Sequence, residues 1–514
     1  MYKLLLCWRY LLTRYIALSS VISVMLGVAT MIVVNAVMLG FTTEMKDRIQ
    51  GILADVSFQS YDLNNGFPDY EYHRAEIFKI AGDLIEELTP VVFTPGMLSY
   101  RPYGTGAQVT LPVDIVGIDE LTQGKVSKFA TYLQHPENRK QLSFDLREEG
   151  YDAQGSGHNG AVREQMKYAG WSYRRYRAAQ EKFQQRQNNP PQDSQEAAEG
   201  PRNPFGGLPQ REDMIFDPAK EQHAGVIVGI GAALRQRTST TDADTGKKIV
   251  EDDLMLLPGD DVTLAFPTSG DNIRFQSDKF TVVELYESKM AEYDRKLIFV
   301  PIEKLQYLRG MYDADSGTYT VTRILIKAKP GVDINELRDR LRGVFPVQMF
   351  SITTWKDDQV DMLNAVYLEL MMLNVLLFLI FAVAGFGILA IFYMIVVEKQ
   401  KDIGILKSLG ASSSGVMQIF LYYSLLLGIV GSTLGLLVGL LFVKYIKEIA
   451  LVLSFILQQE VFSPEIYSFY EIPTFVDVPT VIGIIAGAIF IAASAGVLPA
   501  MRAARVHPVE TLRS

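Results

Sequence analysis

Four long stretches of the chain contain no Asp, Glu, Lys or Arg and consist mostly of apolar residues. They cover residues 15–43, 370–397, 408–443 and 478–501. Each is longer than the ~20 residues that an α-helix needs to cross a bilayer. The pattern predicts an α-helical polytopic membrane protein with four transmembrane helices, the third of them over residues 415–443.

Between the first two predicted spans, residues 44–369 form a large segment of ordinary polarity. Period-two alternation and short β-branched runs predict strands at Ala54–Tyr61, Val109–Ile118, Asp261–Phe266, Phe280–Leu285, Leu297–Pro301 and Val321–Ala328. Apolar residues at helical spacing predict helices at Tyr72–Leu88, Ile302–Leu308 and Ile334–Val344. Strands interleaved with helices predict a mixed α+β domain.

Residues 137–222 are rich in Gln, Asn, Arg, Glu and Pro. The stretch Tyr168–Phe183 is expected to form a short polar helix, and the rest holds too few apolar residues to order itself. We therefore expect a partly disordered insertion. Aromatic and arginine residues alternate from Trp171 to Arg177, which fits a binding patch or a solvated helical arm, and the composition favours the arm.

Positive charge flanking the apolar stretches predicts their orientation, because Lys and Arg favour the cytoplasmic side. The flanking basic residues are Lys3, Arg9, Arg14, Lys399, Lys401, Lys407, Arg502, Arg505 and Arg513. Both termini and the loop 398–414 are therefore expected in the cytoplasm, with the tail over residues 502–514. The domain 44–369 and the acidic loop 444–477 are expected outside the cytoplasm.

Residues 1–14 mix Trp, Tyr and Leu with three basic residues. This composition suits a helix in the inner interface or a simple positive anchor, and both readings stay open. The only cysteine, Cys7, excludes an intrachain disulfide, and Leu6 is too large for a lipobox. No small-x-small site follows the first apolar stretch, so we expect no cleaved signal peptide.

The composition and motifs argue against chemistry carried by this chain. Acidic residues outnumber basic ones by 58 to 49, which argues against a nucleic-acid partner. No two of the five histidines have metal-ligand spacing, and neither G-x-x-x-x-G-K-S/T nor G-x-S-x-G occurs. We expect no catalytic residue, no metal and no bound cofactor.

Two patterns carry more specific expectations. In the loop 398–414, Ile403, Leu406 and Leu409 recur at three-residue steps and predict a short amphipathic helix that ends at Gly410. Its polar residues lie mostly elsewhere, at Lys399, Asp402 and Lys407. The exposed apolar edge suits either a soluble partner protein or the bilayer surface.

The third span contains overlapping small-x-x-x-small repeats, at Gly428, Gly431, Gly435 and Gly439. Glycines at this spacing allow two helix backbones to approach closely. We interpret them as packing positions.

Residues Glu398–Ser412 resemble the loop signature of the permease family that includes macrolide exporters, cell-division permeases and lipoprotein-releasing permeases. Leu498–Arg513 is similar to the ending of that family. Further stretches resemble its lipoprotein-releasing (Lol-type) branch, namely Leu257–Asp260, Glu287–Pro301, Thr354 with Trp355, and Tyr470–Pro473. The resemblance covers nearly the whole chain except about 137–222.

The resemblance implies a pair of permease subunits, identical or paralogous, on two copies of a separate P-loop ATPase that holds ATP and Mg²⁺. It implies a bacterial inner-membrane protein that extracts lipoproteins and passes them to a periplasmic carrier. The loop helix would couple the two chains through Glu398, Lys399, Asp402, Ile403, Leu406, Lys407, Leu409 and Gly410. The alternatives are a macrolide-exporter-like mechanotransmitter, a cell-division-type regulator of a cell-wall hydrolase, and a membrane-anchored enzyme.

An extractor of acyl chains needs an apolar pocket with an adaptable wall. Methionines concentrate near the expected outer ends of the first two spans, and their side chains adapt to flexible ligands. The predicted pocket residues are Met38, Met45, Met371 and Met372, with Met25, Met31 and Met362 nearby. Ordinary packing is the competing interpretation for each of them.

Overall fold

The computed structural model describes residues 15–52, 54–102, 107–151, 161–188, 216–241, 248–270, 272–288, 290–313, 317–457 and 472–506. They fall into two compact units. The helical unit comprises described residues of Met1–Lys46 and Val360–Ser514, and the α/β unit comprises those of Asp47–Gln359. The expected interfacial segment 1–14 and most of the tail lie outside the described residues.

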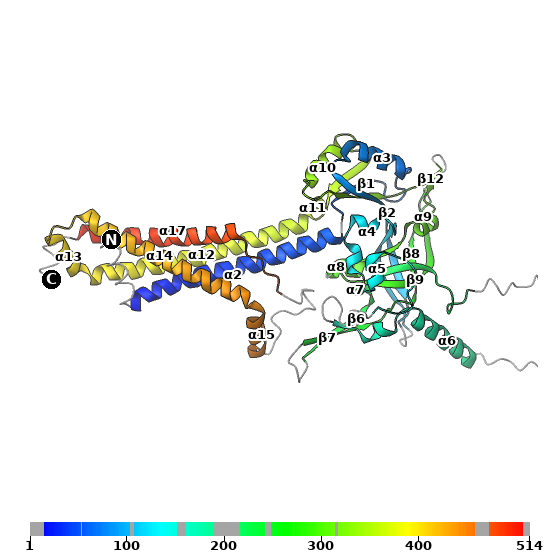
Figure 1. The fold of residues 1–514 in the computed structure, drawn as a ribbon, viewed down its shortest axis with the longest axis horizontal. Helices are drawn as coiled ribbons and strands as arrows, with labels where there is room; N and C mark the ends of the chain where they lie inside the picture. Colours follow the sequence, from blue (N-terminus) through cyan, green and yellow to red (C-terminus); the bar gives the residue numbers. More distant parts are fainter. Residues whose placement is uncertain are drawn as a thin grey trace, which may run out of the picture. The chain divides into compact units, whose positions relative to one another are not determined.

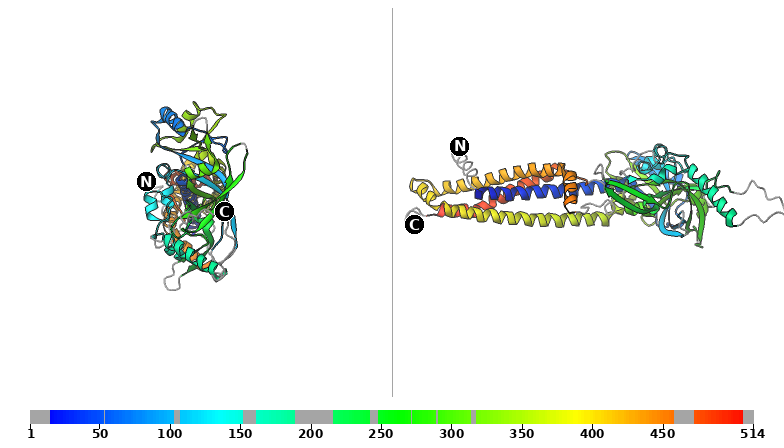
Figure 2. Two further views of the ribbon diagram at one scale, coloured as in Figure 1. Left: turned by 90° about the vertical axis from the view of Figure 1, so that its right-hand side faces the viewer. Right: turned by 90° about the horizontal axis from the view of Figure 1, so that it is seen from below.

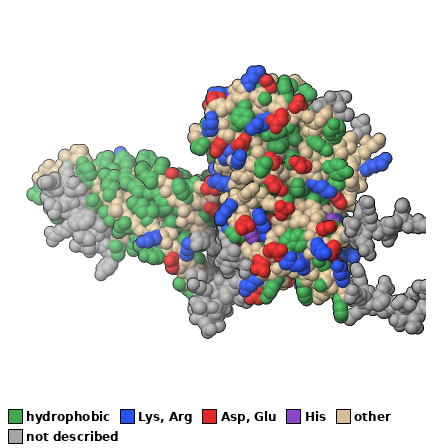
Figure 3. Space-filling model, turned by 45° about the vertical axis from the view of Figure 1, so that its right-hand side comes forward, with side chains coloured by type: hydrophobic (Ala, Val, Ile, Leu, Met, Phe, Trp, Pro, Cys, Tyr) green, Lys and Arg blue, Asp and Glu red, His purple; other side chains and the backbone are tan. Residues whose placement is uncertain are grey.

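The helical unit contains four long helices that run side by side (Figures 1 and 2). They are α2 (Tyr15–Ile52), α12 (Val360–Glu398), α14 (Ser413–Lys444) and α17 (Val478–Arg505). Each is long and apolar enough to cross a membrane. Their visible outer surface is mostly hydrophobic, whereas charged side chains are scattered over the visible face of the α/β unit (Figure 3). These features suit a polytopic membrane protein.

Two shorter helices join the long ones. Helix α13 (Gln400–Ser408) lies between α12 and α14, and α15 (Ile446–Leu457) follows α14 after a break at Tyr445. Most of the loop after α15, from residue 458 to residue 471, lies outside the described residues.

Glycines on α14 permit its close approach to α2. A Cβ atom on Gly435 would lie 2.7 Å from both the Met25 carbonyl oxygen and Val28 Cβ, and one on Gly431 would lie 2.7 Å from Val24 Cβ. Gly439 faces Ile32 at 3.2 Å, while Gly428 faces α17 instead. The glycine repeat therefore lies where α14 meets α2.

The α/β unit is built on a nine-stranded mixed sheet in which the long strand β2 (Ile85–Tyr100) belongs to two parts. The first part has the antiparallel order β14–β1–β13–β2. The second has the order β2–β3–β10–β5–β9–β8, and β8 also pairs with β2, which closes a barrel. The other strands are β1 (Val56–Ser60), β3 (Val109–Ile118), β5 (Ala224–Gly229), β8 (Asp261–Pro267), β9 (Phe275–Tyr286), β10 (Leu297–Pro301), β13 (Arg323–Ala328) and β14 (Phe350–Thr354).

Gly96 makes the closure of the barrel possible. A Cβ atom at this position would lie 2.7 Å from the Ala265 carbonyl oxygen on β8. A glycine in a strand commonly marks such a close backbone approach. The second half of β2 therefore pairs with β3 on one side and β8 on the other.

Helices α3 (Tyr70–Ala81) and α10 (Ile334–Arg342) pack on the four-stranded part of the sheet. They bury Ile77 and Leu337 there, and Phe58 makes an edge-to-face contact with Phe345 at 4.9 Å between ring centroids. Shorter helices lie between the strands along the chain, at α4 (Gln123–Val126), α5 (Pro136–Lys140), α6 (Trp171–Asn188), α7 (Ile230–Ala233), α8 (Ala291–Lys296), α9 (Ile302–Arg309) and α11 (Trp355–Asp358). The small strands are β4 (Ala161–Val162), β6 (Leu234–Thr241), β7 (Lys248–Leu254), β11 (Tyr312–Asp313) and β12 (Thr318–Tyr319).

The predicted strands and helices are present, with one clear error. The helix expected over 72–88 ends at Ala81 with Gly82 as its C-cap, because residues from Ile85 onward enter β2. The run that follows has helix-forming residues, but its pairing with β13 and β3 overrides that local preference.

The expectation for residues 137–222 is wrong over much of its length. Leu142, Phe144, Leu146 and Met166 are buried in the hydrophobic core of the α/β unit. The predicted polar helix is present as α6, but its Arg174 is buried. A few apolar anchors and buried ion pairs therefore order this segment, although its composition is polar. Residues 152–160 and 189–215 lie outside the described residues.

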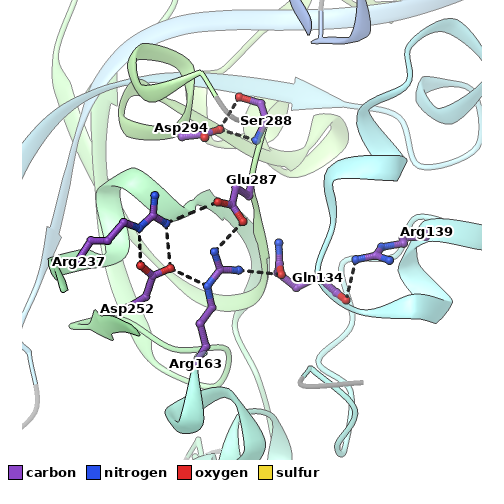
Figure 4. A network of polar contacts seen from close by, with 8 residues as sticks. All are labelled: Gln134, Arg139, Arg163, Arg237, Asp252, Glu287, Ser288 and Asp294. Carbon is purple, nitrogen blue, oxygen red and sulfur yellow. Dashed lines mark hydrogen bonds and ion pairs between the residues drawn. The ribbon is translucent and has the colours of Figure 1, made fainter. Parts of the chain in front are cut away.

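Arg163, from this segment, lies in a network of buried charges with β7 and the end of β9 (Figure 4). Its guanidinium donates to Asp252 Oδ2 at 2.8 Å and to Glu287 Oε2 at 2.6 Å, and Arg237 donates to Asp252 Oδ1 at 2.6 Å. Burial alone would raise the pKa of Asp252, but hydrogen bonding from Arg237 and the charge of Arg163 lower it. The network fixes the polar segment and the β6–β7 hairpin to the barrel.

We predict that Gly435→Ala destabilises the helical unit by about 1–3 kcal/mol, because the added methyl group meets the backbone of α2. Thermal unfolding in detergent measures the effect. Gly483→Ala is the matched control, since nothing lies within 4 Å of its added Cβ. Equal melting temperatures for both variants and the wild type would contradict the close packing.

Candidate functional site

The loop helix α13 is a short helix with a well-defined end (Figure 1). The Gly410 N–H donates to the Lys407 carbonyl at 3.1 Å, and the Ala411 N–H donates to the Leu406 carbonyl at 3.0 Å. This pair of bonds is a Schellman motif, and Gly410 has the left-handed φ of 97° that it favours. The helix and its glycine end agree with the sequence prediction.

One face of α13 packs against the ends of three of the long helices. The Ile403 side chain is buried in a small cluster with Val396, Val416 and Ala503, which come from α12, α14 and α17. Lys407 Nζ donates to two carbonyls at the end of α17, Ala504 at 2.7 Å and Val506 at 2.9 Å. A cation suits the negative end of a helix dipole. Movement of α13 is thus tied to three long helices.

The other face carries exposed apolar side chains. Leu409 is 80% exposed, Ile405 46% and Leu406 39%. The predicted edge is therefore wrong at Ile403, which points inward, and it lacked Ile405. Residues four positions apart, such as Ile405 and Leu409, lie on nearly the same face of a helix, whereas residues six positions apart, such as Ile403 and Leu409, do not. The spacing from Ile405 to Leu409 therefore predicts the exposed face better than the three-residue steps from Ile403.

The remaining predicted residues of this loop are polar and lie around the start of α13. Lys399 Nζ forms an ion pair with Asp402 Oδ2 at 2.7 Å, and the Asp402 side chain is half-exposed. Glu398 is exposed at the end of α12. These charges border the apolar face formed by Ile405, Leu406 and Leu409, hereafter the outer face of α13.

A pocket of about 500 Å³ lies between α2, α12 and α17 in the helical unit. Its apolar lining consists of Leu39, Leu370, Met371, Val375 and Phe378. Four polar side chains also line it, those of Asn35, Tyr367, Asn374 and Thr480. Its size is within the range of about 300–1,000 Å³ that ligand pockets occupy.

Only one of the four methionines predicted for the pocket lines it. Met371 does, whereas its neighbour Met372 is 62% exposed and does not, because successive residues of a helix point about 100° apart. Met38 and Met45 are half-buried on α2 outside the lining. Asn35 and Asn374 were the better signal, since polar residues within apolar spans commonly mark functional sites.

No group of three or more His, Cys, Asp or Glu side chains within the described part of the chain is arranged to hold a metal ion. The site offers binding surfaces: an apolar pocket between α2, α12 and α17, and an exposed apolar face on α13, a helix that is attached to α12, α14 and α17.

Comparison with known proteins places both features in context. Residues 374–508, which include α13, match the family described as FtsX-like permease C-terminal. The chain is 30% identical to the lipoprotein-releasing system transmembrane protein LolC of Xylella fastidiosa, over 46% of this chain and 55% of that protein. It is 27% identical to LolC of Neisseria meningitidis serogroup B, over 60% of this chain and 72% of that protein.

The macrolide export ATP-binding/permease protein MacB of Salmonella paratyphi A is also similar, at 27% identity over 39% of this chain and 29% of that protein. The chain therefore carries an FtsX-like permease domain. This chain spans little more than half the length of the Xylella fastidiosa LolC.

We predict that Lys407→Met loosens the contact between α13 and the end of α17, because it removes both hydrogen bonds to the Ala504 and Val506 carbonyls. Faster proteolysis near residue 506 in detergent is the expected result. Lys401→Met is the control, since Lys401 is exposed and no hydrogen bond from its side chain occurs among the described residues. Identical digestion of both variants would show that the Lys407 hydrogen bonds do not hold α13 to the end of α17.

Proposed function

We propose that this chain is the permease subunit of an ABC transporter that extracts lipoproteins from the bacterial inner membrane and passes them to a periplasmic carrier. The observation that carries the proposal is α13. Its outer face is apolar and exposed, its inner face is fixed to three apolar helices, and it lies in the region that matches FtsX-like permeases.

Helix α13 has the construction that a coupling element needs. A partner ATPase that closes on ATP and Mg²⁺ would bind the outer face of α13 and displace the helix. The buried Ile403 and the bonds from Lys407 would pass that displacement to α12, α14 and α17. Nucleotide then biases a two-state change in which this chain itself hydrolyses nothing.

The apolar pocket supplies the other half of the proposal. Burial is worth about 0.8 kcal/mol per CH₂ group, so acyl chains do not leave the membrane unaided. The apolar side of the pocket, with Met371, Val375 and Phe378, would shelter them. Displacement of α12 against α2 would then change the width of the pocket.

The remaining parts of the proposal follow from charge and similarity. The basic flanks support a cytoplasmic position for both termini and α13, and a periplasmic position for the α/β unit. LolC is a protein of a lipoprotein-releasing system by name, which supports a lipoprotein cargo. The second permease subunit of the pair is either identical or a paralogue.

The similarity to MacB favours one second candidate, an exporter that transmits force across the membrane to an outer partner. The two functions differ in what accumulates when the chain is depleted. Lipoproteins retained in the inner membrane support lipoprotein release, whereas sensitivity to exported compounds with normal lipoprotein sorting supports the exporter.

We predict that Leu406→Glu abolishes co-purification of the ATPase in mild detergent, because a carboxylate on the outer face of α13 must be desolvated at an apolar interface. The level of the protein in the membrane should not change. Gln400→Glu adds the same charge to an exposed position at the start of α13 and should retain the ATPase. Wild-type ATPase recovery and lipoprotein release with Leu406→Glu would refute the coupling role.

We also predict that a photo-crosslinking residue at Met371 captures acylated lipoprotein in membranes, because this side chain lines the apolar pocket. The control position is Leu379 on the same helix, which is 61% exposed and outside the lining. Capture is measured by immunoblotting for a known lipoprotein. Equal capture at both positions would show that the pocket has no special role.

A further inference from the structure

The α/β unit contains a second pocket of about 500 Å³ that the proposed transport function does not use. One wall is formed by α6, and the opposite wall by the end of β2, the start of β8 and part of β9. Ser99, Gln108 and Thr263 contribute hydroxyl and amide groups to it. Ligand pockets are commonly apolar, so a lining of this polarity suits a hydrophilic ligand.

The wall from α6 is held firmly against the barrel. Arg174 donates to both carboxylate oxygens of Asp261, at 2.6 and 3.2 Å, and also to the Gly259 carbonyl at 3.0 Å. The Arg174 side chain is 3% exposed. A two-pronged bond of this kind fixes direction as well as distance. The pocket therefore has a preformed wall.

The lining of this pocket contains more basic than acidic side chains. Four basic side chains and three acidic ones line the pocket. The acidic groups already have cationic partners on α6: Asp261 pairs with Arg174, while Asp260 and Glu181 pair with Arg177 at 3.4 and 3.5 Å.

The other two basic residues, Arg101 and Lys279, form no ion pair with any residue in the described part of the α/β unit. Arg101 follows β2 and Lys279 lies on β9, and both are exposed. The pocket thus carries net positive charge in a chain whose formal charge is −9.

Two unpaired cations at a walled pocket favour one class of ligand. A concave site with charge of one sign concentrates counter-ions there. Arg and Lys bind carboxylates and phosphates through short, charge-assisted hydrogen bonds. The neighbouring hydroxyl and amide groups would add neutral hydrogen bonds to the same ligand.

We propose that this pocket binds a small hydrophilic anion through a carboxylate or phosphate group that contacts Arg101 and Lys279. Arg174 and Arg177 build the wall and are already neutralised, so they position the site without supplying its free charge. The site is independent of the acyl-chain pocket and of α13.

Isothermal titration of the full chain in detergent tests the proposal. Inorganic phosphate and citrate are the two probes, so the experiment separates a phosphate site from a carboxylate site, and glucose is the neutral control. At least one anion should bind, with an affinity that falls as salt concentration rises. Glucose should not bind.

The double variant Arg101→Gln with Lys279→Gln should weaken anion binding by about tenfold or more, because two charge-assisted contacts are lost. Lys125→Gln, at an exposed lysine of α4 outside the pocket, should bind as the wild type does. Unchanged melting temperatures without ligand would show that the double variant is folded. Absence of binding by both anions at millimolar concentration, or equal affinity in the double variant and the wild type, would overturn the proposal.

Discussion

The close contact between α14 and α2 is the constraint on which the helical unit depends. Lipid does not drive apolar helices together as water does, so close backbone packing has to hold them. Gly431, Gly435 and Gly439 give α14 a face without side chains, and Val24, Val28 and Ile32 of α2 fill it. This contact fixes the position of α2, which forms one wall of the apolar pocket in the helical unit.

Helix α13 combines firm attachment with an open surface. Its inner residues are held by apolar burial and by hydrogen bonds to carbonyl groups at the end of α17. Its outer face stays exposed in the isolated chain. A helix that lay flat on a lipid surface would need no such attachment to α17. Under the proposed function a protein partner covers the outer face, a choice that the amphipathic pattern alone left open.

Much of this arrangement could be predicted from the sequence, and the failures have physical causes. The charge-free stretches predict the long helices because backbone satisfaction in a bilayer demands them. Ile403 is buried because successive three-residue steps rotate around a helix. Of the four predicted methionines Met371 lines the pocket, because nearness in sequence does not give the direction of a side chain. The prediction for residues 137–222 failed because Arg163 and Arg174 pair with carboxylates more than 80 positions away in the sequence, and these ion pairs order the segment. Composition within a window does not record such partners.

Strand β2 has a consequence for how the α/β unit responds to force. Its first half, Ile85–Val91, pairs with β13 in the four-stranded part, and its second half, Val91–Tyr100, pairs with β3 in the closed barrel. Val91 pairs with both β13 and β3, so the two parts meet at this residue without a break in the strand. A force on either part therefore reaches the other along the backbone of one continuous strand.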